Sequence, residues 1–152
     1  MRGTRGYVAP EWITGEAVTP KADVYSYGMM LLEVISGRRN LALLKDGRLD
    51  DYFPIQVANA VYKGENVLGL LDDKLEGNAI IEELSRACKI AVWCIQDDEK
   101  DRPTMRQVIR ILEGLAEVDI PPIPRFLQSL AEDSSCSGFF LEISSFSDPL
   151  QA

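Results

Sequence analysis

One apolar stretch constrains the fold of this chain more than any other feature. Residues 24–35 form a twelve-residue run with a single charge, Glu33. Thr19 and Pro20 precede it and predict a helix start, because the Thr hydroxyl can accept from free N–H groups and Pro lacks a donor. Gly37 predicts the helix end. Because the apolar side chains point all round the axis, we expect other elements to surround this helix.

Three further helices are predicted downstream. The first ends near Gly64 and shows an apolar face of Ile55, Ala58, Val61 and Tyr62. The second carries apolar residues at helical spacing between Ile80 and Ile95. The third begins at a capping box of Thr104 and Gln107, and its predicted apolar face consists of Met105, Val108, Ile109, Leu112 and Leu115.

Charge and composition exclude several functions. Sixteen Lys and Arg against 24 Asp and Glu give a net charge of −8, which disfavours nucleic-acid binding. The absence of His excludes His-based catalysis and His metal ligands. Cys88, Cys94 and Cys136 lack the spacing of a metal or redox site, so we expect a reducing environment. The run at residues 24–35 is too short for a membrane span of about 20 residues, and no other segment resembles an anchor or a signal peptide.

Three ordered motifs carry a family resemblance. Gly-Thr-Arg-Gly-Tyr-Val at residues 3–8 is followed by Ala-Pro-Glu at residues 9–11. Asp-Val-Tyr-Ser-Tyr-Gly occupies residues 23–28, and Asp-Arg-Pro-Thr-Met occupies residues 101–105. In this order they resemble the end of a protein-kinase activation segment and the helices that follow it. Trp12 and the Ala-Val-Trp-Cys-Ile-Gln string at 91–96 are similar to plant receptor-like serine/threonine kinases, most of all the S-domain, or G-type lectin, group.

The resemblance implies an all-α fold, a partial kinase large lobe of about four main helices. We expect residues 1–116 to form this partial kinase domain. Residues 117–152 are rich in Pro and Ser, and we expect them to be a mostly disordered tail in which Phe139, Phe140 and Leu141 form a lone apolar patch.

The resemblance implies structural roles for three charged residues. In the family, the residues that match Glu11 and Arg102 form an ion pair, whereas the alternative is two separate surface charges. The residue that matches Asp23 anchors the catalytic loop through hydrogen bonds to its backbone. The alternative for Asp23 is a favourable interaction with the dipole of its own helix.

The resemblance also assigns Thr4, Arg5, Gly6 and Tyr7 to the substrate-docking loop. The competing interpretation is a flexible N-terminus, and we favour it because nothing upstream of Met1 is present to hold the segment. Thr4, or a Ser of the tail, is a candidate for phosphorylation by another kinase, although a Ser-rich tail is more often only a solvated linker.

The motifs of phosphoryl transfer are absent from the 152 residues. Neither a Gly-rich loop nor His-Arg-Asp nor Asp-Phe-Gly occurs. We therefore predict no catalytic, cofactor-binding or metal-binding residue in this chain. ATP and Mg²⁺ belong to the full-length family, and alone the chain is expected to be inactive. One flank of the apolar helix should be bare, because the part of a kinase that covers it is missing.

Three hypotheses remain open at this point. The chain is a truncated large lobe of a receptor-like kinase, a docking module or decoy for a full-length kinase or its protein substrates, or an inert product with exposed apolar faces. As written the chain is expected to be cytoplasmic. As part of a receptor kinase it would lie on the cytoplasmic side of the plasma membrane.

Overall fold

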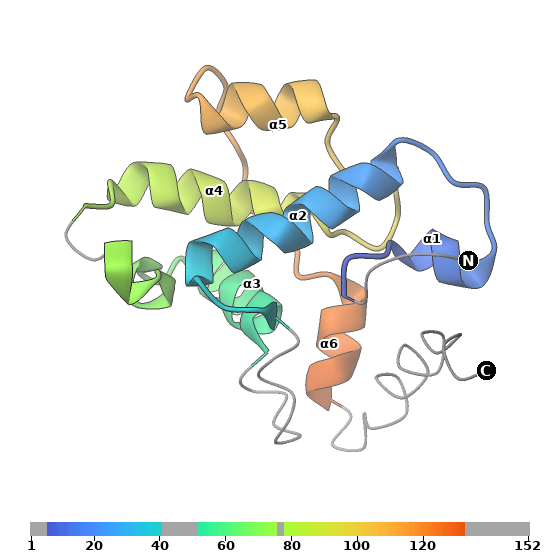
Figure 1. Ribbon diagram of the computed structural model, residues 1–152, viewed down its shortest axis with the longest axis horizontal. Helices are drawn as coiled ribbons and strands as arrows, with labels where there is room; N and C mark the ends of the chain where they lie inside the picture. Colours follow the sequence, from blue (N-terminus) through green and yellow to red (C-terminus); the bar gives the residue numbers. More distant parts are fainter. Residues whose placement is uncertain (1–5, 41–51, 76–77, 133–152) are drawn as a thin grey trace, which may run out of the picture.

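The computed structural model describes residues 6–40, 52–75 and 78–132 (Figure 1). Every regular element in these ranges is helical, which confirms the all-α prediction. The α-helices are α1 (Pro10–Thr14), α2 (Lys21–Ser36), α3 (Phe53–Lys63), α4 (Ile81–Cys94), α5 (Met105–Leu112) and α6 (Arg125–Glu132), with short 3₁₀ turns η3 (Leu68–Leu70) and η4 (Asp73–Leu75) between α3 and α4. None of the described helices is both long and apolar enough to cross a bilayer.

The predicted apolar helix is α2, and it occupies the centre of the fold (Figure 1). The Thr19 hydroxyl accepts a hydrogen bond from the Lys21 N–H at 3.2 Å, as its position before the helix predicted. At the other end Gly37 adopts a left-handed conformation with φ of 67°, and its N–H donates to the Glu33 carbonyl. The predicted end at Gly37 is therefore confirmed, while the helix starts one residue later than predicted, at Lys21, with Pro20 in the N-cap position.

The crossing of α2 and α4 depends on a glycine. A Cβ atom at Gly28 would lie 2.6 Å from Cys94 Cβ and 2.8 Å from Ile95 Cγ2. Cβ atoms essentially never approach this closely, so only a residue without a side chain allows the two helix backbones to meet here. The contact buries Cys94 and Ile95 completely.

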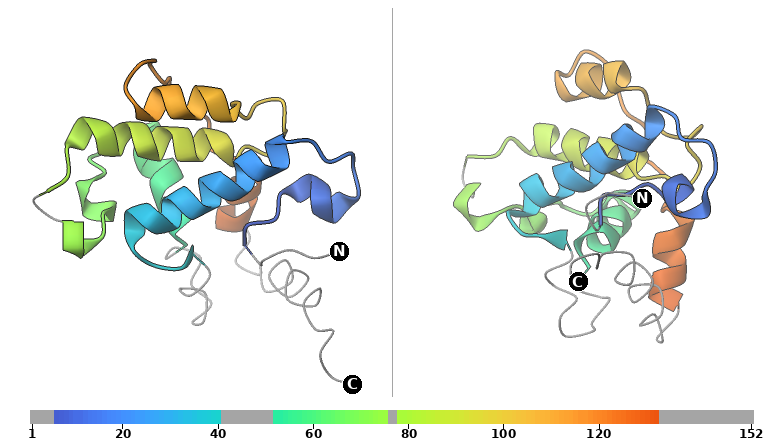
Figure 2. Two further views of the ribbon diagram at one scale, coloured as in Figure 1. Left: turned by 45° about the horizontal axis from the view of Figure 1, so that its top comes forward. Right: turned by 45° about the vertical axis from the view of Figure 1, so that its right-hand side comes forward.

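α3 ends and α5 begins where the sequence predicted, but parts of their predicted apolar faces are wrong. The capping box of Thr104 and Gln107 is present, and α3 ends at Gly64. Tyr62, however, is 58% exposed and Ile109 is 51% exposed. α5 lies on the outer side of α4 (Figure 2), so only the face with Val108 and Ile111 turns inward. Met105 and Leu115, also predicted for the inner face, are exposed as well.

The expectation of a mostly disordered tail from residue 117 is corrected for residues 117–132. These residues lead into α6, whose Leu127 and Leu130 are buried in the same core cluster as Val57 of α3. Composition alone suggested a linker, but two leucines three positions apart are sufficient to dock one helical face once the prolines direct the chain toward α3. Residues 133–152, with the predicted apolar patch, lie outside the described residues.

One flank of α2 is open, as expected from its all-round apolar character. Met30 is 46% exposed and Val34 is 61% exposed, whereas Met29 and Leu32 on the opposite side are buried. Aliphatic side chains of this size are usually covered when a helix occupies the centre of a fold. The open flank is therefore an exposed apolar surface at the centre of the fold.

Gly28→Ala tests the close helix crossing. The added methyl must displace Cys94 or Ile95, so we expect the free energy of unfolding to fall by about 1–3 kcal/mol although Ala favours helices. Urea denaturation of the full chain measures this. Gly69→Ala is the matched control, because no atom lies within 4 Å of its added Cβ, and it should change stability by less than about 0.5 kcal/mol. Equal effects of the two substitutions would contradict the steric explanation.

Candidate functional site

A buried ion pair joins the start of α1 to the loop before α5. Glu11 Oε1 accepts from Arg102 Nη1 at 2.6 Å, and Glu11 Oε2 accepts from Arg102 Nη2 at 2.9 Å. Two parallel bonds of this kind are the strongest geometry that a guanidinium and a carboxylate can adopt. The structure thus brings together two residues that lie 91 positions apart, and they are not two separate surface charges.

Arg102 is 2% exposed, and the five N–H groups of its guanidinium all have acceptors. Besides the two bonds to Glu11, it donates to the backbone carbonyls of Lys21, Gln96 and Asp97 at 2.8–3.1 Å. Its Cζ atom also lies 5.0 Å from the centroid of the Tyr25 ring, which is a cation–π distance. A buried charge is tolerated only when it is paired and hydrogen-bonded, and here both conditions are met.

The ion pair shifts the acidity of its carboxylate. Burial of Glu11 favours the protonated form, but the hydrogen bonds and the positive charge of Arg102 favour the carboxylate more strongly. The net result is that the pKa of Glu11 lies below its ordinary value of 4.5. Glu11 is therefore ionised at neutral pH and acts as a structural clamp rather than a proton donor.

The predicted docking loop is only partly within the described residues. Thr4 and Arg5 lie outside them, whereas Gly6 adopts φ of 82° and Tyr7 is half-buried. The Tyr7 hydroxyl donates to Glu33 Oε2, and the Ser26 hydroxyl donates to the Tyr7 carbonyl at 2.6 Å. The favoured expectation of a flexible N-terminus is therefore wrong for Tyr7, because α2 itself supplies the groups that hold it.

Glu33 also binds the chain that follows α2. Its second carboxylate oxygen accepts from the backbone N–H of Asn40 at 2.9 Å. One carboxylate thus binds both Tyr7 and the chain after α2. We call residues 6–9, which include the described part of the predicted docking loop, the docking segment. Burial raises the pKa of the Tyr7 phenol, and the neighbouring Glu33 carboxylate raises it further, so the phenol remains a hydrogen-bond donor at neutral pH.

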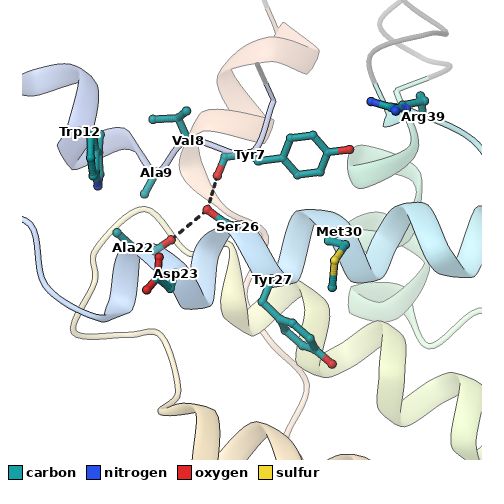
Figure 3. Close-up of a pocket in the computed structure, with 10 residues that line it drawn as sticks. All are labelled: Tyr7, Val8, Ala9, Trp12, Ala22, Asp23, Ser26, Tyr27, Met30 and Arg39. Carbon is teal, nitrogen blue, oxygen red and sulfur yellow. Dashed lines mark hydrogen bonds between the residues drawn. The ribbon is translucent and has the colours of Figure 1, made fainter. Parts of the chain in front are cut away.

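An open groove of about 700 Å³ lies between the docking segment and α2 (Figure 3). Side chains from successive turns of α2 line one side of it, and residues before and within α1 line the other. The lining residues are Tyr7, Val8, Ala9, Trp12, Ala22, Asp23, Ser26, Tyr27, Met30 and Arg39. The groove is predominantly apolar and is continuous with the exposed Met30 on the open flank of α2.

Asp23 is the acidic member of this groove. Its carboxylate is exposed and makes no side-chain hydrogen bond to another described residue, although it lies in the first turn of α2. An exposed carboxylate beside apolar surface can accept hydrogen bonds from a segment that docks there. No group of three or more His, Cys, Asp or Glu that could hold a metal ion occurs among the described residues.

The sequence pointed to Glu11, Arg102 and Asp23, but only through motifs. It missed Tyr25, which lies over the guanidinium, and the role of Glu33 in holding Tyr7. Glu33 did carry a signal, because it is the single charge in the apolar run of α2. A lone charge on a helix that is otherwise apolar is expected to have a specific partner.

Comparison with known proteins decides the family. The sequence profile of the protein kinase domain matches residues 1–111 of this chain. The chain belongs to the protein kinase family. Its all-helical fold is that of a partial kinase large lobe, as the motifs predicted.

The similar kinases confirm the predicted subgroup. A G-type lectin S-receptor-like serine/threonine-protein kinase of Arabidopsis thaliana is 56% identical over 131 residues, which cover 86% of this chain and 16% of that protein. The related kinase SD2-2 from the same plant is 46% identical over 145 residues, covering 91% of this chain and 18% of its own length. A probable receptor-like protein kinase of Arabidopsis is 41% identical over 129 residues, or 80% of this chain and 28% of its length. The chain thus spans less than a third of these relatives.

Glu11→Gln tests how much the ion pair contributes to the stability of the fold. Loss of the charge leaves the Arg102 guanidinium buried without a counter-ion, and we expect a cost of about 3–5 kcal/mol in the free energy of unfolding. Glu65→Gln is the matched control, because Glu65 forms an exposed pair with Lys63 at 3.9 Å and should contribute less than about 1 kcal/mol. Chemical denaturation distinguishes the two, and similar losses would contradict the special role of Glu11.

The dependence of the free energy of unfolding on pH, at acidic pH, provides a second test. Because the pKa of Glu11 is lowered on folding, its contribution is fully present above pH 4.5 and is lost as the pH falls through the folded-state pKa. The stability difference between the wild-type chain and Glu11→Gln should therefore shrink below pH 4.5. Urea titrations from pH 7 to pH 3 measure it. A difference that stays constant over this range would show that the carboxylate titrates alike in both states.

Proposed function

We propose that this chain is the substrate-side part of the catalytic domain of a receptor-like serine/threonine kinase. In this function it positions the protein substrate and supports the catalytic loop, and it does not transfer phosphate by itself. The family and its relatives support the first part of the proposal. The absence of the Gly-rich loop, His-Arg-Asp and Asp-Phe-Gly from the 152 residues supports the second.

The observation that carries the proposal is the groove with Asp23 at its edge. It combines apolar surface on α2 with a free carboxylate, and it opens beside the docking segment that ends in α1. Such a surface suits a segment that buries apolar side chains and offers backbone N–H groups to the carboxylate. We propose that the catalytic loop of the kinase is this segment, with Asp23 as its anchor.

The residues of this chain divide the work of support between them. Arg102 and Glu11 hold α1, while Glu33 and Ser26 hold the docking segment at Tyr7. Phosphoryl transfer depends mainly on positioning, so rigid support of this kind is its principal requirement. ATP with Mg²⁺ supplies the phosphoryl group and its charge neutralisation, and we assign no residue of this chain to either.

The proposed function implies a protein substrate as the partner of this chain and a place of action in the cell. We propose that Thr4, Arg5, Gly6 and Tyr7 face the protein substrate, as the resemblance implies. The proposed site of action is the cytoplasmic side of the plasma membrane. A second candidate function is that of a decoy that docks on a full-length kinase or its substrates, and the exposed apolar flank at Met30 and Val34 favours it.

A complementation assay tests the proposal. The full 152-residue chain with Mg-ATP and a generic serine/threonine protein substrate should incorporate no phosphate. Addition of the kinase-domain segment that precedes the matching region in the 56%-identical Arabidopsis relative should restore incorporation. Asp23→Ala should lower the restored rate at least about tenfold, because it removes hydrogen bonds to a charged acceptor. Asp73→Ala removes an equally exposed carboxylate in η4 and is the matched control.

Each outcome of this assay separates one part of the proposal. Phosphate incorporation by the chain alone would disprove its inactivity. Equal rates with Asp23→Ala and Asp73→Ala would disprove the anchor. If the chain instead inhibits the full-length relative and does not complement the separate segment, the decoy function replaces the one proposed.

A further inference from the structure

Residues 117–132, which we call the C-terminal strap, are bound by polar side chains at the end of α4. Trp93 Nε1 donates to the backbone carbonyl of Asp119 at 3.1 Å. Gln96 Nε2 donates to the carbonyl of Pro122 at 2.8 Å. Figures 1 and 2 show the strap returning from α5 past the end of α4 to reach α6. The side chains that bind it lie in one short segment, residues 93–97.

Asp97 makes the strongest of these contacts. One carboxylate oxygen accepts from the Arg125 N–H at 2.6 Å and the other from the Phe126 N–H at 3.1 Å. These are N–H groups of the first turn of α6, which have no partner within the helix itself. Asp97 therefore caps a helix that begins 28 residues later in the chain and complements the positive end of its dipole.

Apolar contacts complete the docking of the strap. Leu127 is fully buried and shares a core cluster with Ala9, which directly precedes α1. Pro121 and Pro124 are buried before the helix begins. The strap is thus part of the folded core although it lies beyond the stretch that the kinase family profile matches.

The backbone of the same short segment also binds Arg102 of the ion pair. The backbone carbonyls of Gln96 and Asp97 accept from Arg102 at 2.8 Å and 3.1 Å, while their side chains bind the strap. Gln96 and Asp97 therefore contribute to both structures at once. If the strap leaves, these residues lose partners that fix their backbone, and two of the five acceptors of a buried guanidinium are no longer held in place.

We propose that the strap is a positioning element for α1 and that Asp97 is the positioning residue that links them. Docking of the strap and formation of the Glu11–Arg102 pair are thermodynamically coupled through residues 96–97. Release of the strap loosens α1, and docking tightens it. The proposal concerns two parts of this chain and does not depend on the function proposed above.

Hydrogen exchange of the full chain tests the coupling. Asp97→Asn retains the shape of the side chain but replaces one of the two accepting oxygens with an NH2 group, which faces an N–H donor and cannot accept from it. We expect the α6 amide of Gln128 to lose about tenfold in protection, and the α1-region amides of Trp12 and Glu16 to lose protection with it. The Asp72 amide, which donates to Ile35 far from the strap, should keep its protection.

Asp101→Asn is the matched control. It removes the same charge from an exposed carboxylate of the same loop that holds no part of the strap, and it should leave Trp12 and Glu16 unchanged. The proposal is overturned if Asp97→Asn loosens α6 while α1 keeps the protection seen in Asp101→Asn. Equal losses at Trp12, Gln128 and Asp72 would also overturn it, because they would show only a global loss of stability.

A milder variant covers the case in which Asp97→Asn does not fold. Trp93→Phe keeps an aromatic ring on the core cluster of Val24 and Val108, and it removes the bond to Asp119 together with a small part of that packing. It should lower the protection of Gln128 and Trp12 together by a smaller factor, again without an effect at Asp72. Loss at Gln128 alone would count against the coupling.

Discussion

The described structure depends above all on the need of one buried cation for acceptors. The Arg102 guanidinium is removed from water, and leaving any of its N–H groups unpaired would be costly. Its five acceptors come from α1, from the start of α2 and from the loop after α4. These segments are distant in sequence, so satisfying one side chain fixes their relative positions.

The central helix α2 divides the molecule into a closed side and an open side. On the closed side Gly28 allows the backbone of α4 to approach, and Met29 and Leu32 are buried. On the open side Asp23 and Met30 line a groove beside the docking segment. The closed side holds the helix in place, and the open side carries the groove on which the proposed support of the catalytic loop rests.

Much of the helical architecture could be predicted because its signals are local. The capping box at Thr104, the glycine ends at Gly37 and Gly64, and the apolar spacing of α4 act within one or two turns of helix. The candidate site was less accessible. Glu11 and Arg102 were paired only by resemblance to a family, because no local rule connects residues so far apart. The role of Glu33 became evident only when Tyr7 was seen beside it.

The sequence by itself determined the end of α2 at Gly37, the end of α3 and the start of α5, that α2 must be enclosed on most sides, and to which family the motifs point. These properties follow from backbone capping and from the periodicity of apolar residues, both of which are local. Only the tertiary structure decided that the strap docks, that α5 buries a single narrow face, and that Arg102 finds all its acceptors. Such outcomes depend on which surfaces meet, because burial and the pairing of polar groups are properties of contacts between segments and not of the segments alone.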